Sequence, residues 1–223
     1  MRKNVSLAVV LWLSLLGSVG FAFEFGGGGP IVVYIPGGTL YGLKNINIPV
    51  VDLPEFTGGI IAFGGYGYGG VPGMTYGGGF GFGGEKEVTK DGKNYKIEVG
   101  GGFGGGLKNI SFGNVSLLAG VYFGSIDIIL GRKVNENNTN VSNLEDGTLE
   151  GYLTTSIGYI SIAADLAIAV KVTDFMQLEV GTIAIGGYSP DGWLVNGKPL
   201  QGLTQYNNFL LTYGFYGGAG FGF

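Results

Sequence analysis

A few charged side chains interrupt apolar runs of this sequence, and they are its first candidates for chemistry. They are Lys96, Glu98, Asp165, Lys171 and Glu179. Each alternates with apolar or small neighbours, and in a β-strand this alternation places the charged groups on one face and the apolar groups on the other. If the charged face lines a closed sheet, it would bind or pass small solutes. The alternative, which we favour, is a lumen filled by ion pairs and ordered water, because side chains fill the interior of a small barrel.

The common catalytic centres have no residues to form them in this chain. It contains no Cys and no His, so thiol nucleophiles, His general bases, His metal sites and Ser-His-Asp triads are excluded. Two carboxylates can hydrolyse a glycosidic bond, but only at a separation of about 5–10 Å, which a sequence does not define. We therefore expect no enzymatic activity, no cofactor and no bound metal ion.

The composition indicates a β-protein whose surface is largely withdrawn from water. Of its 223 residues, 48 are Gly, 15 are Phe and 13 are Tyr, and only 13% are charged. A soluble domain carries about 25% charged residues. Gly is unfavourable in a helix by about 1 kcal/mol relative to Ala, so alternating Gly and aromatic residues favour strands. The net charge of −4 makes nucleic acid a poor partner.

The first 22 residues have the order of an export signal. Arg2 and Lys3 precede an apolar run over 5–16, and small residues follow at the expected cleavage site after Ala22. The run is much shorter than the ~20 residues of a membrane-spanning helix, so a signal peptide is favoured over an anchor. We predict a signal peptide over 1–22 and one domain over 23–223. Later apolar runs are also too short for a helix, so a membrane location would require a barrel.

The clearest strand signal is a hairpin over 159–180 with a turn at 173–174. Asp165, Lys171 and Glu179 share its polar parity. In a membrane barrel the apolar parity faces lipid and the polar parity faces the lumen. The main apolar parity comprises Ile160, Ile162, Leu166, Ile168, Val170 and Val172, and it resumes with Leu178 and Val180.

Two neighbouring segments, 74–84 and 95–108, combine an apolar parity with a row of glycines. Lys96 and Glu98 lie on the glycine parity of the second segment. We predict that the apolar parity again faces lipid, as in a membrane barrel. The glycines would then form a strip of bare backbone on the inner wall, with Lys96 and Glu98 in the lumen.

Loop lengths favour eight strands. Within 115–130 the apolar residues change parity, which either a β-bulge near Gly124 and Ser125 or a turn would explain. The bulge is preferred because short and long connections then alternate, as in membrane barrels. We predict an all-β, antiparallel up-and-down barrel of about eight strands, with ten as the alternative, and with long outer loops. The strands are expected at about 30–36, 58–70, 74–86, 93–108, 112–133, 148–172, 175–188 and 206–223.

The connecting segments carry three further predictions. Segment 37–57 is rich in apolar residues and Pro, so we expect it to fold into the barrel mouth as a plug or, as a second choice, to dock a partner. The Asn-rich segment 134–147 lacks the spacing of a calcium loop and is expected to be solvated. Tyr188 and Trp193 are expected at the membrane interface.

The last strand of the chain is amphipathic and ends in an aromatic residue. Its apolar parity includes Phe209, Leu211, Tyr213, Phe215, Phe221 and Phe223. Together with the export signal and the alternating strands, this strand resembles the C-terminal strand of outer-membrane β-barrel proteins. The Gly content is also similar to that of Gly-rich surface proteins of thermophilic bacteria. The first resemblance implies that the barrel-assembly machinery recognises these residues as an assembly signal.

These observations favour an outer-membrane barrel with a structural, passive-transport or surface role and no catalysis. Membrane lipid and the assembly machinery are its expected partners. The sequence leaves open whether a small solute or a protein is a further partner. The alternative is a soluble, exported β-barrel or β-sandwich, periplasmic or extracellular, that binds a lipid or another apolar ligand. A half-buried strand of a soluble sheet shows the same alternation.

Overall fold

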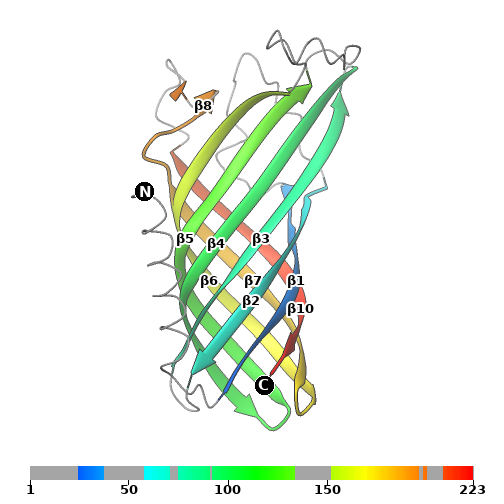
Figure 1. Ribbon diagram of the computed structural model, residues 1–223, viewed down its shortest axis with the longest axis vertical. Helices are drawn as coiled ribbons and strands as arrows, with labels where there is room; N and C mark the ends of the chain where they lie inside the picture. Colours follow the sequence, from blue (N-terminus) through cyan, green and yellow to red (C-terminus); the bar gives the residue numbers. More distant parts are fainter. Residues whose placement is uncertain are drawn as a thin grey trace, which may run out of the picture.

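Eight antiparallel strands close into a barrel (Figure 1). The computed structural model describes residues 25–37, 58–70, 75–90, 92–133, 152–195, 198–199 and 208–222. The barrel strands follow one another around the wall in chain order, and pairing of β1 with β10 closes it. They are β1 (Phe25–Ile35), β2 (Ile60–Gly70), β3 (Thr75–Lys90), β4 (Lys93–Phe112), β5 (Val115–Lys133), β6 (Tyr152–Thr173), β7 (Met176–Tyr188) and β10 (Phe209–Phe221). The all-β, up-and-down barrel is confirmed, with eight strands in its wall rather than ten.

Two short strands extend the sheet without joining the barrel wall. β8 (Leu194–Val195) pairs with β6, and β9 (Lys198–Pro199) pairs with β8. In the part of the chain that the structure describes, no helix is long and apolar enough to cross a membrane. The predicted signal peptide, residues 38–57 of the apolar segment, segment 134–147 and Phe223 lie outside the described residues, so what was predicted for them stays a prediction.

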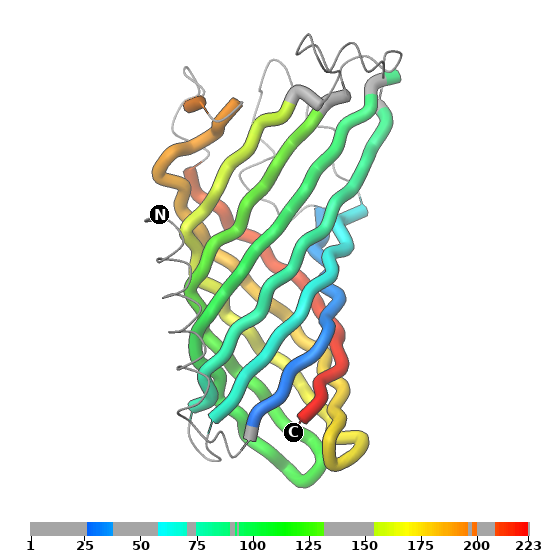
Figure 2. The backbone as a smooth tube through the Cα atoms, viewed as in Figure 1, coloured from blue at the N-terminus to red at the C-terminus, as the bar shows by residue number. Residues whose placement is uncertain are grey.

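The strands differ in length, and β3 to β6 reach furthest from the end of the barrel that holds the C-terminus (Figures 1 and 2). At that end, β4 is joined to β5 and β6 to β7 by two-residue turns. At the opposite end, β3 continues to Lys90 and β4 begins at Lys93, so the connection predicted over 87–92 is shorter than expected. Gly92 in this turn has a φ of 72°, a conformation that Gly adopts without strain.

The outer wall carries a belt of exposed apolar side chains about as tall as a membrane is thick. On β6 the belt runs from Ile160 to Val172, on the parity that the sequence predicted. These ~12 residue steps, at ~3.3 Å each and with a strand tilt of ~40°, cover about 30 Å along the barrel axis. That length matches the hydrocarbon core of a bilayer. Exposed aromatic residues border the belt at its two ends: Phe63, Phe123, Tyr188 and Phe209, and then Phe112, Phe175 and Phe221.

The apolar parity of β5 changes along the strand without a bulge. Its register with β6 is continuous from Val115 to Lys133. Within the belt, Val121 and Phe123 face outward. Beyond Ser125 the apolar side chains face inward instead. The predicted bulge at Gly124 and Ser125 is therefore wrong.

A change of solvent around the continuous strand explains the change of side. Within the belt, apolar side chains face outward toward hydrocarbon. Further along, Asp127 faces outward and the interior packs like that of a water-soluble protein. We call the buried residues of this part the projecting core; they include Ile97, Ile126, Ile128, Leu130, Ile157 and Trp193. The predicted interfacial position of Trp193 is wrong, since it is buried in this core, whereas Tyr188 is exposed on the outer wall.

Replacing Ile128 with Ala tests the projecting core. Ile128 is fully buried, and deleting a buried side chain of this size costs about 2–5 kcal/mol. Asp127→Ala is the matched control, because its side chain faces outward, and we expect a change within about 0.5 kcal/mol. Urea unfolding of the detergent-refolded protein measures both. Equal losses from the two substitutions would contradict the inward packing of this part of β5.

Candidate functional site in the barrel lumen

Aromatic side chains from β2 to β5 fill one side of the lumen. Phe80 stacks on Phe103 with ring centroids 4.9 Å apart, and it meets Tyr122 edge-on at 5.1 Å. Phe82 lies beside Phe80, with centroids 6.3 Å apart. The apolar parities of 75–84 and 95–108 thus face inward, which corrects the prediction that the apolar parities of 74–84 and 95–108 face lipid. The physical reason is volume, since these rings occupy space that would otherwise be a void.

The glycines of the same strands face outward, so the glycine strip predicted on the inner wall is wrong. They pair with one another across β2, β3 and β4 and form what we call the glycine face. It comprises Gly65, Gly67, Gly69, Gly77, Gly79, Gly81, Gly83, Gly100, Gly102, Gly104 and Gly106. A Cβ added at Gly77 or Gly102 would meet no atom within 4 Å. Packing inside the barrel therefore does not require glycine at these two positions.

Small residues on the facing wall make room for the rings. Ala163, Ala167 and Ala169 of β6 are buried. Gly181 of β7 lies against the ring of Tyr216, where an added Cβ would sit 2.7 Å from Tyr216 Cε1. Large side chains on one wall and small ones on the other interdigitate at high density. This part of the lumen is a packed interior rather than an open channel.

Two carboxyl groups and a phenol meet among these residues. The hydroxyl of Tyr216 on β10 lies 2.9 Å from Asp165 Oδ1 on β6 and 2.7 Å from Glu179 Oε1 on β7. These strands are adjacent in the wall, which places the three side chains on one inner face. The structure therefore brings Asp165 and Glu179 together in the lumen. We call Asp165, Glu179 and Tyr216 the acidic triad.

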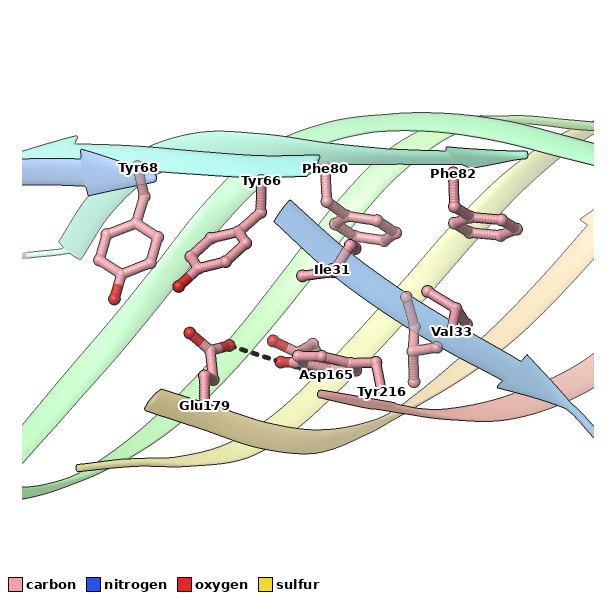
Figure 3. A pocket seen from close by; sticks show the side chains of 10 residues that line it. Ile31, Val33, Tyr66, Tyr68, Phe80, Phe82, Asp165, Glu179 and Tyr216 are labelled. Atoms are coloured by element: carbon pink, nitrogen blue, oxygen red, sulfur yellow. Dashed lines mark hydrogen bonds between the residues drawn. The ribbon is translucent and has the colours of Figure 1, made fainter. Parts of the chain in front are cut away.

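A cavity of about 30 Å³ separates the acidic triad from the aromatic wall. Figure 3 shows the rings of Tyr66, Phe80 and Phe82 on one side of the cavity and the triad on the other. Glu179 is only 4% exposed. Its Oε2 atom and the hydroxyl of Tyr66 are both buried beside this cavity. The Tyr66 hydroxyl points toward Glu179 (Figure 3), so a phenol donor and a carboxylate acceptor face each other across the same small space.

At the C-terminal end of the barrel the lumen widens into a polar vestibule of about 300 Å³. Lys171 lines this vestibule and forms an ion pair with Asp174 at 3.4 Å. Gln177 Nε2 donates a hydrogen bond to the Tyr68 hydroxyl at 2.7 Å. Tyr68 lines both spaces, so the bond between Gln177 and Tyr68 lies where the vestibule meets the smaller cavity.

The structure places Lys96 and Glu98 on the outer wall, which corrects their assignment to the lumen. Tyr95, Ile97 and Val99 occupy the inward parity of this part of β4. Lys96 Nζ lies 2.6 Å from Glu85 Oε2 and 3.1 Å from Glu98 Oε1. Hydrogen bonds to Glu85 and then Glu98 hold the pKa of Lys96 above its ordinary value. This cluster faces solvent on the projecting part and takes no part in the acidic triad.

Sequence reasoning missed the two tyrosines of the lumen site, Tyr216 and Tyr66. The signal for Tyr216 was its parity, because it alternates with the outward Phe215 on the last strand. Tyr66 lies in a Gly-Tyr repeat whose two parities carry no charge. The residues predicted as the assembly signal, Phe209, Leu211, Tyr213, Phe215 and Phe221, all point outward and are exposed. Their role in assembly stays a prediction.

The comparisons with known proteins give no specific role. A closed, eight-stranded antiparallel barrel with an apolar outer wall has the architecture of an outer-membrane β-barrel. Among solved structures, the crystal structure of a major outer membrane protein from Thermus thermophilus is similar, with 11% identity and a TM-score of 0.43 over 88% of this chain and 99% of that chain. No family model matches the chain, and no curated protein matches it.

Gly181→Ala tests the packing of the lumen. The new methyl group would press on the ring of Tyr216 and on Ala167, and overpacking of this kind costs about 1–3 kcal/mol. Gly102→Ala on the glycine face is the control, because its methyl group meets nothing in the barrel, and we expect a change below about 1 kcal/mol. Urea unfolding in detergent compares the two. A larger loss at Gly102 than at Gly181 would argue against a packed lumen.

Proposed function

We propose that this chain is an outer-membrane β-barrel with a structural or surface role, without catalysis and without solute passage through its own lumen. The observation that carries this proposal is the reversal of sidedness along β5. Apolar side chains face outward in the belt, whereas Ile126 and Ile128 face inward beyond it. This pattern is favourable where hydrocarbon surrounds the belt and water surrounds the projecting part.

Packing inside the described strands argues against passive transport. Ile97, Ile126 and Ile128 are fully buried in the projecting core. The cavity beside the acidic triad, at about 30 Å³, has room for about one water molecule. A solute would need a continuous opening, and these side chains stand in its way.

The soluble alternative, a carrier of a lipid or another apolar ligand, is disfavoured by both faces of the wall. Phe63 is 67% exposed and Ile160 is 69% exposed, and many large apolar residues beside them are also exposed. Soluble monomers rarely expose such a large contiguous apolar surface. Pockets for ligands of this kind measure about 300–1,000 Å³ and are mostly apolar. The cavity beside the acidic triad holds only about 30 Å³, and the vestibule of about 300 Å³ is lined mainly by polar residues.

Refolding of the chain from residue 23 into detergent tests the membrane proposal. A closed barrel keeps its backbone hydrogen bonds in SDS until it is heated, so we expect boiled and unboiled samples to migrate differently. Planar bilayers containing the refolded protein should show no steady conductance above background. A monodisperse protein that needs no detergent would sink the membrane proposal. Steady ohmic conductance would instead overturn only the claim that the lumen is closed.

A further inference from the structure

The inward parity of several strands changes from apolar to polar where the lumen widens into the vestibule. On β4, the buried Leu107 is followed on this parity by Asn109 and Ser111. On β5, Ser116 stands before the buried Leu118 in the same way. Polar side chains from four strands and one turn therefore line the vestibule; they are Asn109, Ser111, Asn114, Ser116, Lys171 and Gln177.

The outward parity of the same strand ends stays apolar. The exposed side chains there include Ile110, Phe112, Val115, Leu117, Val170 and Val172. The outer wall thus still suits hydrocarbon at the level where the lumen becomes polar. The polarity of the vestibule belongs to its interior alone and does not mark the point at which the strands leave the apolar belt.

Three of the polar side chains form a hydrogen-bonded row on the vestibule wall. Ser111 Oγ donates to Asn109 Oδ1 at 3.0 Å, and the hydroxyls of Ser111 and Ser116 lie 2.9 Å apart. Because a hydroxyl carries one proton, Ser116 donates to Ser111 in this row. The row positions an amide and two hydroxyls before any ligand arrives, and such preorganisation lowers the cost of binding.

Lys171 is the charged residue among the described residues that line the vestibule. Its partner Asp174, at 3.4 Å, has a fully exposed side chain. An exposed ion pair of this kind adds little stability. A carboxylate on a ligand would therefore replace Asp174 at low cost and accept a charge-assisted hydrogen bond from Lys171.

Two tyrosines give the vestibule an aromatic side as well. The rings of Tyr68 and Tyr76 meet edge-on, with centroids 5.9 Å apart, and both residues line the vestibule. A ligand with an apolar ring face would pack against them. The volume of about 300 Å³ is at the lower end of the range for small-molecule sites, so the ligand is about the size of one sugar ring.

We propose that the vestibule binds a small sugar acid, a polyhydroxylated ring that carries one carboxylate. Lys171 pairs with the carboxylate, and the side chains of Asn109 and Ser116 bond the ring hydroxyls, since amides and hydroxyls both donate and accept. The ring lies against Tyr68 and Tyr76. This inference rests on the vestibule alone and not on the proposed role of the protein.

The site is a dead end. At its inner side Gln177 Nε2 donates a hydrogen bond to the Tyr68 hydroxyl at 2.7 Å. Beyond this bond lies only the cavity of about 30 Å³ beside the acidic triad, which has no room for a sugar ring. The ligand therefore enters and leaves at the C-terminal end of the barrel.

The test is isothermal titration calorimetry of the detergent-refolded protein with sodium glucuronate, glucose or sodium acetate at one ionic strength. Glucose lacks the carboxylate, and acetate lacks the ring and its hydroxyls. We expect saturable binding of glucuronate, with glucose and acetate each weaker by about tenfold or more, because hydrogen bonds to charged groups are the stronger ones. Equal responses to all three would overturn the proposal. Acetate binding as tightly as glucuronate would overturn the assignment to a sugar.

Lys171→Met should remove the preference for glucuronate over glucose. Lys108→Met is the matched control, because Lys108 lies on the exposed outward parity of β4 near the same end, and it should leave the preference unchanged. If Lys171→Met does not refold, Ser116→Leu narrows the vestibule instead and should weaken glucuronate binding by about tenfold or more. Unaltered glucuronate binding in the refolded variant would place the ligand elsewhere and overturn the proposal. Binding by a protein that needs no detergent would overturn only the membrane proposal.

Discussion

Closure of the sheet between β1 and β10 is the interaction on which the rest of the barrel depends. Strand pairing from Gly28 with Phe221 to Tyr34 with Phe215 leaves neither strand as an edge. In hydrocarbon an unpaired amide or carbonyl costs several kcal/mol. The constraint is most severe on the glycine face, where no side chain shields the backbone. There the ladder between neighbouring strands alone satisfies the polar groups.

Closure also fixes a volume that the side chains must fill, and β2 to β4 supply most of it. Their aromatic rings point inward, so the small residues of β6 and β7 are needed opposite them. The space left between the two walls is about 30 Å³, and the acidic triad borders it. Asp165 and Glu179 are thus confined by packing. Their chemistry is that of an enclosed site rather than of a water-filled channel.

The alternation in the sequence predicted the strands and their number, but not which face of each strand looks outward. On β6 one parity is large and apolar and the other is small or polar, so the choice was correct. On β4 either the apolar side chains or the glycines could face outward, because lipid tolerates both. The volume of the whole lumen decides which of them does, and no single strand reveals that volume. Beyond Ser125 on β5 the surrounding solvent changes, and from the sequence alone this change is indistinguishable from a bulge.

The glycine face gives the barrel a front and a back in the plane of the membrane. Over β5 to β7, exposed side chains such as Phe123 and Ile162 hold acyl chains at a distance from the backbone. Over β2 to β4, acyl chains reach the peptide groups themselves. The wall is thus thick and corrugated on one side and thin and smooth on the other. The annular lipid shell is unequal around the circumference, and anything that approaches laterally meets a different surface from each direction.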